Sequence, residues 1–148
     1  MGKMNWNRII LGGLLAAVVM MVLAILNMET LQRPWLDAAL ELLGTRTDAD
    51  WWRFFAALGI LCLVGGIMSV WLYAAIRPRY GPGPKTAAIV GFASWLLTST
   101  VDWFWASTGL VPSRGLTVPL LAYLPILIVV AISGAWLYKE DGEQEKEA

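Results

Sequence analysis

Side chains able to do chemistry are scarce in this chain of 148 residues, and the most conspicuous one is an aspartate inside an apolar segment. An ionisable residue within a membrane helix is costly, by about 2.5–3.5 kcal/mol at the bilayer centre, and by default marks an ion, proton or substrate path. Asp102 follows Thr98 and Ser94 at spacings of four, which places all three on one face of a helix. Asn27, at the end of the first apolar segment, is expected at the same depth. These four residues are the candidate polar site.

A structural interpretation of Asp102 competes with the functional one. The residue lies near the outer end of its segment beside Trp103, where the cost of burial falls, and Arg53 or Arg114 could pair with it at the same level. The apolar segments contain no second acid with which to build a proton relay. Hydroxyl groups in membrane helices usually bond back to their own helix, so those near Asp102 do not require a substrate as partner.

Residue types that the chain lacks exclude several kinds of site. There is no histidine and one cysteine, Cys62, which rules out a haem held by two histidines, a conventional zinc or iron–sulfur site built from this chain alone, and a disulfide within the chain. No residues have the spacing of a catalytic triad or a paired-acid site, so we expect no enzymatic activity. No basic patch indicates nucleic acid as a partner. We predict no cofactor, and the sequence leaves open a pigment, quinone or lipid held non-covalently.

Four long apolar segments must position these residues. They cover residues 9–26, 52–76, 86–106 and 116–138, and the chain has a mean hydropathy of +0.62. About 20 residues at ~1.5 Å each match a hydrocarbon core of about 30 Å. We therefore predict an all-α membrane protein with four transmembrane helices, at about residues 8–27, 52–76, 86–107 and 116–138, in a single domain of residues 1–148. The first segment is too long for a signal peptide and no cleavage site follows it, so we expect it to be kept.

Proline and glycine mark the boundaries between these helices. Pro78 is expected to end the second helix sharply, and Pro84 to open the third in its first turn. Residues 34–43, with proline in the first turn and glycine just after the end, predict a short amphipathic helix in the first outer loop. The acidic tail, residues 140–148, is expected to be solvated and disordered.

The distribution of cations predicts the orientation in the membrane. With a cytoplasmic N-terminus, the inner side carries seven Lys and Arg residues and the outer side four, so the positive-inside rule favours cytoplasmic N- and C-termini. Arg77, Arg79 and Lys85 lie in a short inner loop and are expected to anchor it to lipid phosphates. Aromatic residues near both boundaries, including Tyr73 and Tyr138, are expected at the level of the lipid headgroups.

Small residues mark the faces expected to pack, because apolar surface alone does not drive helices together in lipid. The predicted packing positions are Gly12, Gly13, Ala16 and Ala17 in the first helix, Gly59, Cys62, Gly66 and Ser69 in the second, and Gly91 in the third. Those of the second helix follow spacings of three and four and form one continuous stripe that ends at Tyr73. The run Trp71-Leu-Tyr is repeated at Trp136-Leu-Tyr, which fits either two tandem hairpins or simple interface chemistry.

Two longer runs carry a resemblance to known proteins. Trp71-Leu-Tyr-Ala-Ala-Ile-Arg-Pro-Arg-Tyr-Gly-Pro-Gly-Pro-Lys-Thr-Ala87 and Gly134-Ala-Trp-Leu-Tyr-Lys139 resemble a group of small bacterial membrane proteins of unknown function. The start Met4-Asn-Trp and the run Arg8-Ile-Ile-Leu-Gly-Gly13 resemble the same group. The resemblance implies a four-helix protein of the bacterial inner membrane, and it carries no catalytic or binding residues.

Three functional hypotheses follow from a compact bundle without chemistry of its own. The first is an accessory or structural subunit of a larger membrane complex, such as an energy-transducing one. The second is a small transporter or channel in which Asp102 and the neighbouring hydroxyls line a path. The third is a membrane sensor or assembly factor whose acidic tail is a docking handle. The expected partners are membrane lipid and other membrane subunits or further copies of this chain.

Overall fold

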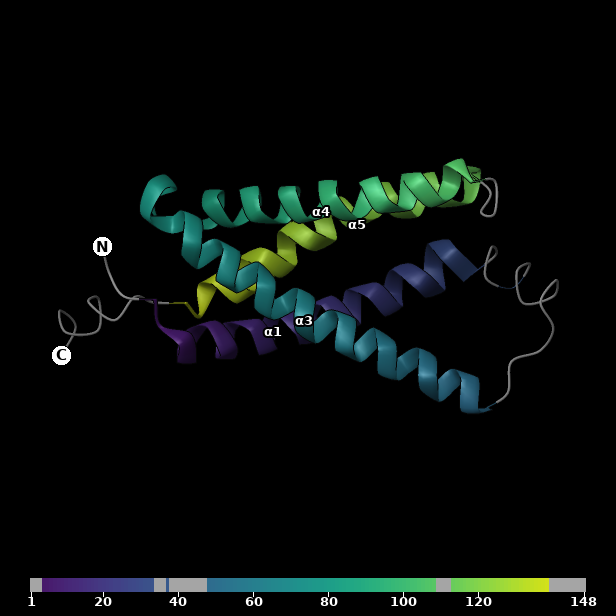
Figure 1. The fold of residues 1–148 in the computed structure, drawn as a ribbon, viewed down its shortest axis with the longest axis horizontal. Coiled ribbons are helices and arrows are strands. Elements are labelled where there is room, and N and C mark those ends of the chain that lie inside the picture. The colour runs from purple at the N-terminus through teal and green to yellow at the C-terminus, as the bar shows by residue number, and fades with distance from the viewer. Residues whose placement is uncertain (1–3, 34–36, 38–47, 109–112, 139–148) are drawn as a thin grey trace.

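The computed structural model describes residues 4–33, 37, 48–108 and 113–138, and all the structure within these ranges is helical (Figure 1). The elements are α1 (Trp6–Asn27), a π-helical turn η1 (Met28–Gln32), α3 (Asp48–Tyr80), α4 (Pro84–Ser107) and α5 (Ser113–Trp136). The segments Trp6–Gln32, Asp50–Tyr80, Pro84–Phe104 and Thr117–Trp136 are each long and apolar enough to cross a membrane. An all-helical fold with four such helices is confirmed at this level. The predicted helix at 34–43 and the tail at 140–148 lie outside the described residues, apart from Asp37.

Local chemistry explains where two of these helices begin. Asn5 is the N-cap of α1, and its side-chain oxygen accepts the backbone N–H of Arg8 at 3.0 Å. Pro84 is the first residue of α4, as predicted, because a proline there gives up an N–H that has no partner within the helix.

The end of the second long helix differs from the prediction. Helix α3 passes through Pro78 and ends at Tyr80, so the expectation that Pro78 stops it is wrong. Proline removes one backbone donor but leaves the following residues free to complete the turn. Gly81 ends the helix instead: its φ is 81°, and its N–H donates to the carbonyl of Arg77 at 2.8 Å. A glycine in the left-handed conformation is a common helix terminator because it has no Cβ to clash.

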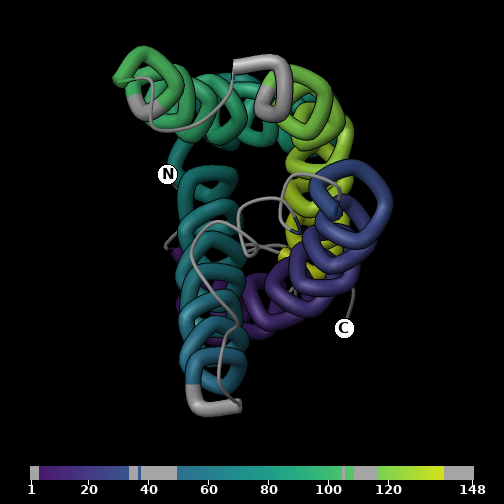
Figure 2. The backbone as a smooth tube through the Cα atoms, turned by 90° about the vertical axis from the view of Figure 1, so that its right-hand side faces the viewer, coloured from purple at the N-terminus to yellow at the C-terminus, as the bar shows by residue number. Residues whose placement is uncertain are grey.

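The helices run up and down the bundle and form two pairs, α1 with α3 and α4 with α5 (Figure 1). Helix α5 also crosses towards α1, where Gly134 meets Gly12, and Trp95 of α4 donates its indole N–H to the carbonyl of Leu120 at 2.8 Å. We call the end with Trp6 and Tyr80 the narrow end and the opposite end, with Asn27, the wide end. Figure 2 shows the wide end, where the start of α3 and the end of α4 lie on opposite sides.

The buried core lies towards the narrow end. Its members come from all four long helices and include Ile9, Val70, Val90 and Val130, each at most 1% exposed. In contrast, no described residue of α3 before Cys62 is buried. The helices therefore pack tightly over one half of the bundle and diverge over the other.

Glycines make the tight half, because they let backbones touch. A Cβ added to Gly66 would lie 2.5 Å from the carbonyl oxygen of Gly13, and one added to Gly91 would lie 2.6 Å from the Cα of Ile128. Real Cβ atoms do not approach other atoms so closely, so only glycine fits. Ala16, Ala17, Cys62 and Ser69 are also buried at these contacts.

Gly59 departs from the predicted stripe. A Cβ added there would meet nothing within 4 Å, so this glycine does not lie at a contact between described helices. The stripe is continuous along α3, but the neighbouring helix covers it only from Cys62 onwards. Sequence spacing defines a face of a helix and does not define how far a partner extends along it.

The glycine contacts predict a strong difference between two identical substitutions. Gly66→Ala should lower the free energy of unfolding by about 1–3 kcal/mol, because the added methyl forces two backbones apart. Gly59→Ala should leave it unchanged or raise it, since the methyl enters open space and alanine favours helix. Equilibrium unfolding of detergent-solubilised protein, followed by tryptophan fluorescence, measures both. Equal losses in the two variants would contradict the packing described here.

Candidate functional site

No described hydrogen bond or ion pair links the side chains of the four residues in the predicted polar site. The hydroxyl of Thr98 is exposed and donates to the carbonyls of Ser94, at 3.1 Å, and Trp95, at 3.0 Å, within its own helix. Asp102 is half-buried and forms no ion pair with another described residue. Ser94, Thr98 and Asp102 thus share a face of α4, but no described hydrogen bond joins their side chains.

Of the two arginines expected to pair with Asp102, the structure describes the side chain of Arg53 alone, and it lies beside another acid. Arg53 is 82% exposed and lies 3.7 Å from Asp50, three residues earlier in the same helix. The side chain of Arg114 lies outside the described residues. An exposed pair such as Arg53 and Asp50 is worth less than about 1 kcal/mol.

Asn27 is the only buried residue of the four in the predicted polar site. Its side chain is 3% exposed, and neither its amide nitrogen nor its oxygen has a hydrogen-bond partner among the described residues. Ser99 is 5% exposed, and its hydroxyl also has no hydrogen-bond partner among the described residues. Each such buried group costs about 1–3 kcal/mol when unsatisfied. Among the described residues, no hydrogen bond therefore joins these buried polar groups to a partner.

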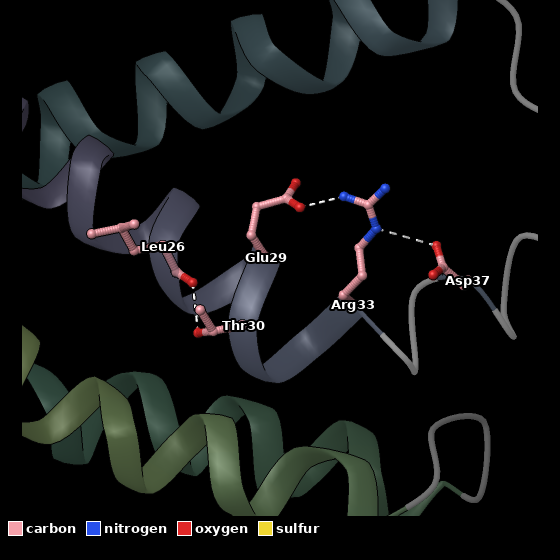
Figure 3. Close-up of polar contacts among 5 residues, drawn as sticks. All are labelled: Leu26, Glu29, Thr30, Arg33 and Asp37. Atoms are coloured by element: carbon pink, nitrogen blue, oxygen red, sulfur yellow. Dashed lines mark hydrogen bonds and ion pairs between the residues drawn. The ribbon is translucent and has the colours of Figure 1, made fainter.

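Beyond Asn27 the chain becomes polar and its turn widens. The backbone N–H of Met28 is shared between the carbonyls of Ala24 and Ile25, and the π-helical turn η1 follows. Figure 3 shows Arg33 between two acids: it forms an ion pair with Glu29, and its Nε lies 3.6 Å from Asp37. Both pairs are exposed, so they mark the end of the apolar segment and hold no buried charge.

A cavity of about 430 Å³ lies at the narrow end of the bundle. Its walls come from the last turns of α3 and α5, the loop between α3 and α4, and the first residues of α4. The described residues that line it are Tyr73, Arg77, Pro82, Gly83, Pro84, Ala87, Ile132, Ala135, Trp136 and Tyr138.

Two tyrosines form the inner wall of this cavity. Tyr73 and Tyr138 are 3% and 4% exposed, and their rings meet edge to face with centroids 6.0 Å apart. Both were expected at the headgroup level, and the structure adds that they are buried against each other inside the bundle. The repeated Trp-Leu-Tyr run was the signal that could have found them, since one copy lies two turns before the end of α3 and the other begins at the last residue of α5. In each copy the tyrosine is buried, whereas Trp136 is 80% exposed.

Hydrogen bonds fold the loop of residues 81–83 onto the tyrosines. The backbone N–H of Gly83 donates to the hydroxyl oxygen of Tyr73 at 3.0 Å. The hydroxyl of Thr86, which is 2% exposed, donates to the carbonyl of Gly81 at 2.7 Å. Gly83 has a φ of 127°, a conformation that other residues rarely adopt. The loop is thus fixed at both ends by buried side chains.

Arg77, one of the three predicted lipid anchors, is buried in the last turn of α3. It is 7% exposed, and its guanidinium carbon lies 5.7 Å from the centre of the Tyr138 ring, within the range of a cation–π contact. Arg79 and Lys85, the other two predicted lipid anchors, are exposed. Of the three cations predicted to anchor this region, Arg77 therefore lines a cavity, whereas Arg79 and Lys85 are exposed.

Comparison with known proteins adds no relative: no family model, curated protein or solved structure matches this chain. Among the described residues, no three His, Cys, Asp or Glu side chains gather as they would to hold a metal ion. The narrow-end cavity combines a buried cation with an aromatic ring and is the candidate site of the described chain.

The bond between Tyr73 and Gly83 makes a prediction about the loop. Tyr73→Phe keeps the ring contact with Tyr138 but removes the acceptor for the Gly83 N–H, so the free energy of unfolding should fall by about 1–2 kcal/mol. Hydrogen exchange at the Gly83 amide should also accelerate. Tyr80→Phe is the control, since Tyr80 is 63% exposed at the end of the same helix. Unchanged exchange in Tyr73→Phe would show that the bond does not hold the loop.

Proposed function

We propose that the protein spans a bacterial inner membrane four times and serves as a non-catalytic accessory subunit of a larger membrane complex. The observation that carries this proposal is Gly59, a glycine on the packing stripe of α3 that no described helix covers. The remaining small residues of that stripe, Cys62, Gly66 and Ser69, are all buried in the tight half of the bundle. A partner helix seated on the wide half would use Gly59.

Close approach is the reason a glycine matters at this place. In lipid, helices associate through van der Waals packing, and small residues let two backbones come near enough for it. A glycine facing only acyl chains gains nothing from its missing side chain and weakens the helix by up to about 1 kcal/mol relative to alanine. Gly59 lies three residues before Cys62 and seven before Gly66, so a partner would continue the groove that α1 already fills.

Aromatic residues next to this groove supply the larger contact area that an interface needs. The rings of Trp51, Phe54 and Phe55 contact one another at the start of α3, with centroids 5.5–6.3 Å apart. Trp52 beside them is 78% exposed. Tryptophan and phenylalanine are enriched where subunits meet and contribute much of the binding energy there.

The charge distribution supports a cytoplasmic narrow end. Arg79 and Lys85 are exposed in the loop region that joins α3 to α4, and positive residues in short loops favour the cytoplasmic side. Both chain termini would then be cytoplasmic, and the wide end would face outwards. The resemblance to small bacterial membrane proteins supports the choice of membrane.

Gly59→Leu should release the partner while leaving the bundle folded. The added side chain fills the groove and should reduce co-purification of the larger complex at least about tenfold, since the loss of close helix contact exceeds about 1.4 kcal/mol. The matched control is Ala57→Leu, which adds bulk to an exposed position on the opposite side of the same helix turn. Native purification in mild detergent, with mass analysis of what co-migrates, measures the association. A wild-type protein that runs only as a monomer or homo-oligomer overturns the proposal.

Asp102→Asn separates the accessory role from transport. We expect normal association and a change of less than about 1 kcal/mol in unfolding free energy, because Asp102 is half-buried and forms no ion pair with a described residue. A transporter or channel that uses this carboxylate would instead lose ion- or proton-coupled flux in liposomes. Thr98→Val is a useful companion, since the Thr98 hydroxyl donates only within its own helix. Measurable flux in the wild type that Asp102→Asn abolishes would replace the accessory role with transport.

A further inference from the structure

We propose that the narrow-end cavity binds the phosphate group of an anionic membrane lipid, with Arg77 contacting the phosphate and the end of α5 contacting the acyl chain. This inference concerns a different part of the molecule from Gly59 and does not depend on the accessory role. It rests on the charge of the cavity, its apolar wall and the fixed geometry of its loop.

Charge is the first argument. Arg77 is the one charged side chain among the described residues that line the cavity, and it is buried. A phosphate beside this guanidinium would gain a strong charge-assisted interaction, because the site is largely shielded from water. The guanidinium group offers several N–H donors in one plane, a geometry that matches phosphate oxygens. The ring of Tyr138, 5.7 Å from the guanidinium carbon, restricts where those donors can point.

The apolar wall is the second argument, and it distinguishes a lipid from a free phosphate ion. Ile132, Ala135 and Trp136 form the side of the cavity on α5. Ile132 is 37% and Trp136 80% exposed, so this wall continues onto the outer surface of the helix. A volume of about 430 Å³ lies within the range of small-molecule sites, about 300–1,000 Å³. A bare phosphate would leave the wall unused, whereas a lipid would lay its glycerol and acyl chain along it.

The third argument is that the site is held in shape by the rest of the protein. Gly83 and Pro84 both line the cavity, and α4 begins at Pro84. The start of a helix carries a partial positive charge. The Tyr73 hydroxyl fixes Gly83, and the Thr86 hydroxyl fixes Gly81. Little ordering of the loop would accompany binding, which favours affinity. The cavity also lies at the end of the apolar helices, where lipid headgroups would be in a bilayer.

The test uses the full chain in an uncharged maltoside detergent. Three probes are titrated: dihexanoyl phosphatidylglycerol, dihexanoylglycerol, which lacks the phosphate, and inorganic phosphate. Binding is followed through the fluorescence of the tryptophans, one of which lines the cavity, and through the shift in melting temperature. The variants are Arg77→Gln and its matched control Arg79→Gln, an exposed arginine two residues away.

We expect saturable binding of phosphatidylglycerol, with Arg77→Gln weakening the Kd at least about tenfold and Arg79→Gln changing it by less than about threefold. Dihexanoylglycerol and inorganic phosphate should bind far more weakly. Ala135→Leu, which narrows the cavity without altering Arg77, should also weaken phosphatidylglycerol binding, and it keeps the test decisive if Arg77→Gln does not fold.

Three outcomes would overturn the proposal. Equal weakening by Arg77→Gln and Arg79→Gln would show diffuse attraction to the charged loop. An effect of inorganic phosphate equal to that of the lipid would make the occupant a soluble anion. A lower basal melting temperature in Arg77→Gln with an unchanged lipid-induced shift would make Arg77 a purely structural residue.

Discussion

The structure depends on direct contact between helix backbones at a few glycines. Gly13 and Gly66 join α1 to α3, Gly12 and Gly134 join α1 to α5, and Gly91 joins α4 to α5. A methyl group at any of these positions would come within 3 Å of another atom. In an apolar solvent the hydrophobic effect does not press helices together, so the stability of such a bundle comes from close packing. These contacts decide which surfaces of the four helices are covered and which are left for other molecules.

Because the glycine contacts lie in the narrow half and the middle of the bundle, the two ends have different properties. At the narrow end the last turns of α3 and α5 converge, which brings Tyr73 and Tyr138 together and encloses Arg77 beside them. At the wide end α3 diverges from α4, and no described atom lies within 4 Å of a Cβ added at Gly59. One physical constraint thus generates both proposals: a lipid in the enclosed cavity and a partner helix on the uncovered face.

Polar side chains follow a simple division in this fold. The hydroxyls of Thr98, Thr100 and Ser133 donate to carbonyls of their own helices. Tyr73, Thr86 and Trp95 instead form hydrogen bonds that join separate elements or close the loop at the narrow end. The first group adds no contact between helices, whereas the second determines how the loop and the α4–α5 pair are arranged. Asn27 and Ser99 belong to neither group among the described residues, since both are buried without a partner.

By itself the sequence determined the number and type of the helices, because long apolar runs are a property of the chain alone and have few ways to satisfy their backbone groups in lipid. It also identified Gly12, Gly13, Gly66 and Gly91 as close contacts and the start of α4 at Pro84, whereas it missed Gly134 and included Gly59, which has no such contact. Only the tertiary structure decided that Arg77 lines a cavity while Arg79 is exposed, although both residues lie in the last turn of α3. The physical reason is that burial depends on which helix crosses a given face, and at what level. Spacing along one helix carries no information about that crossing.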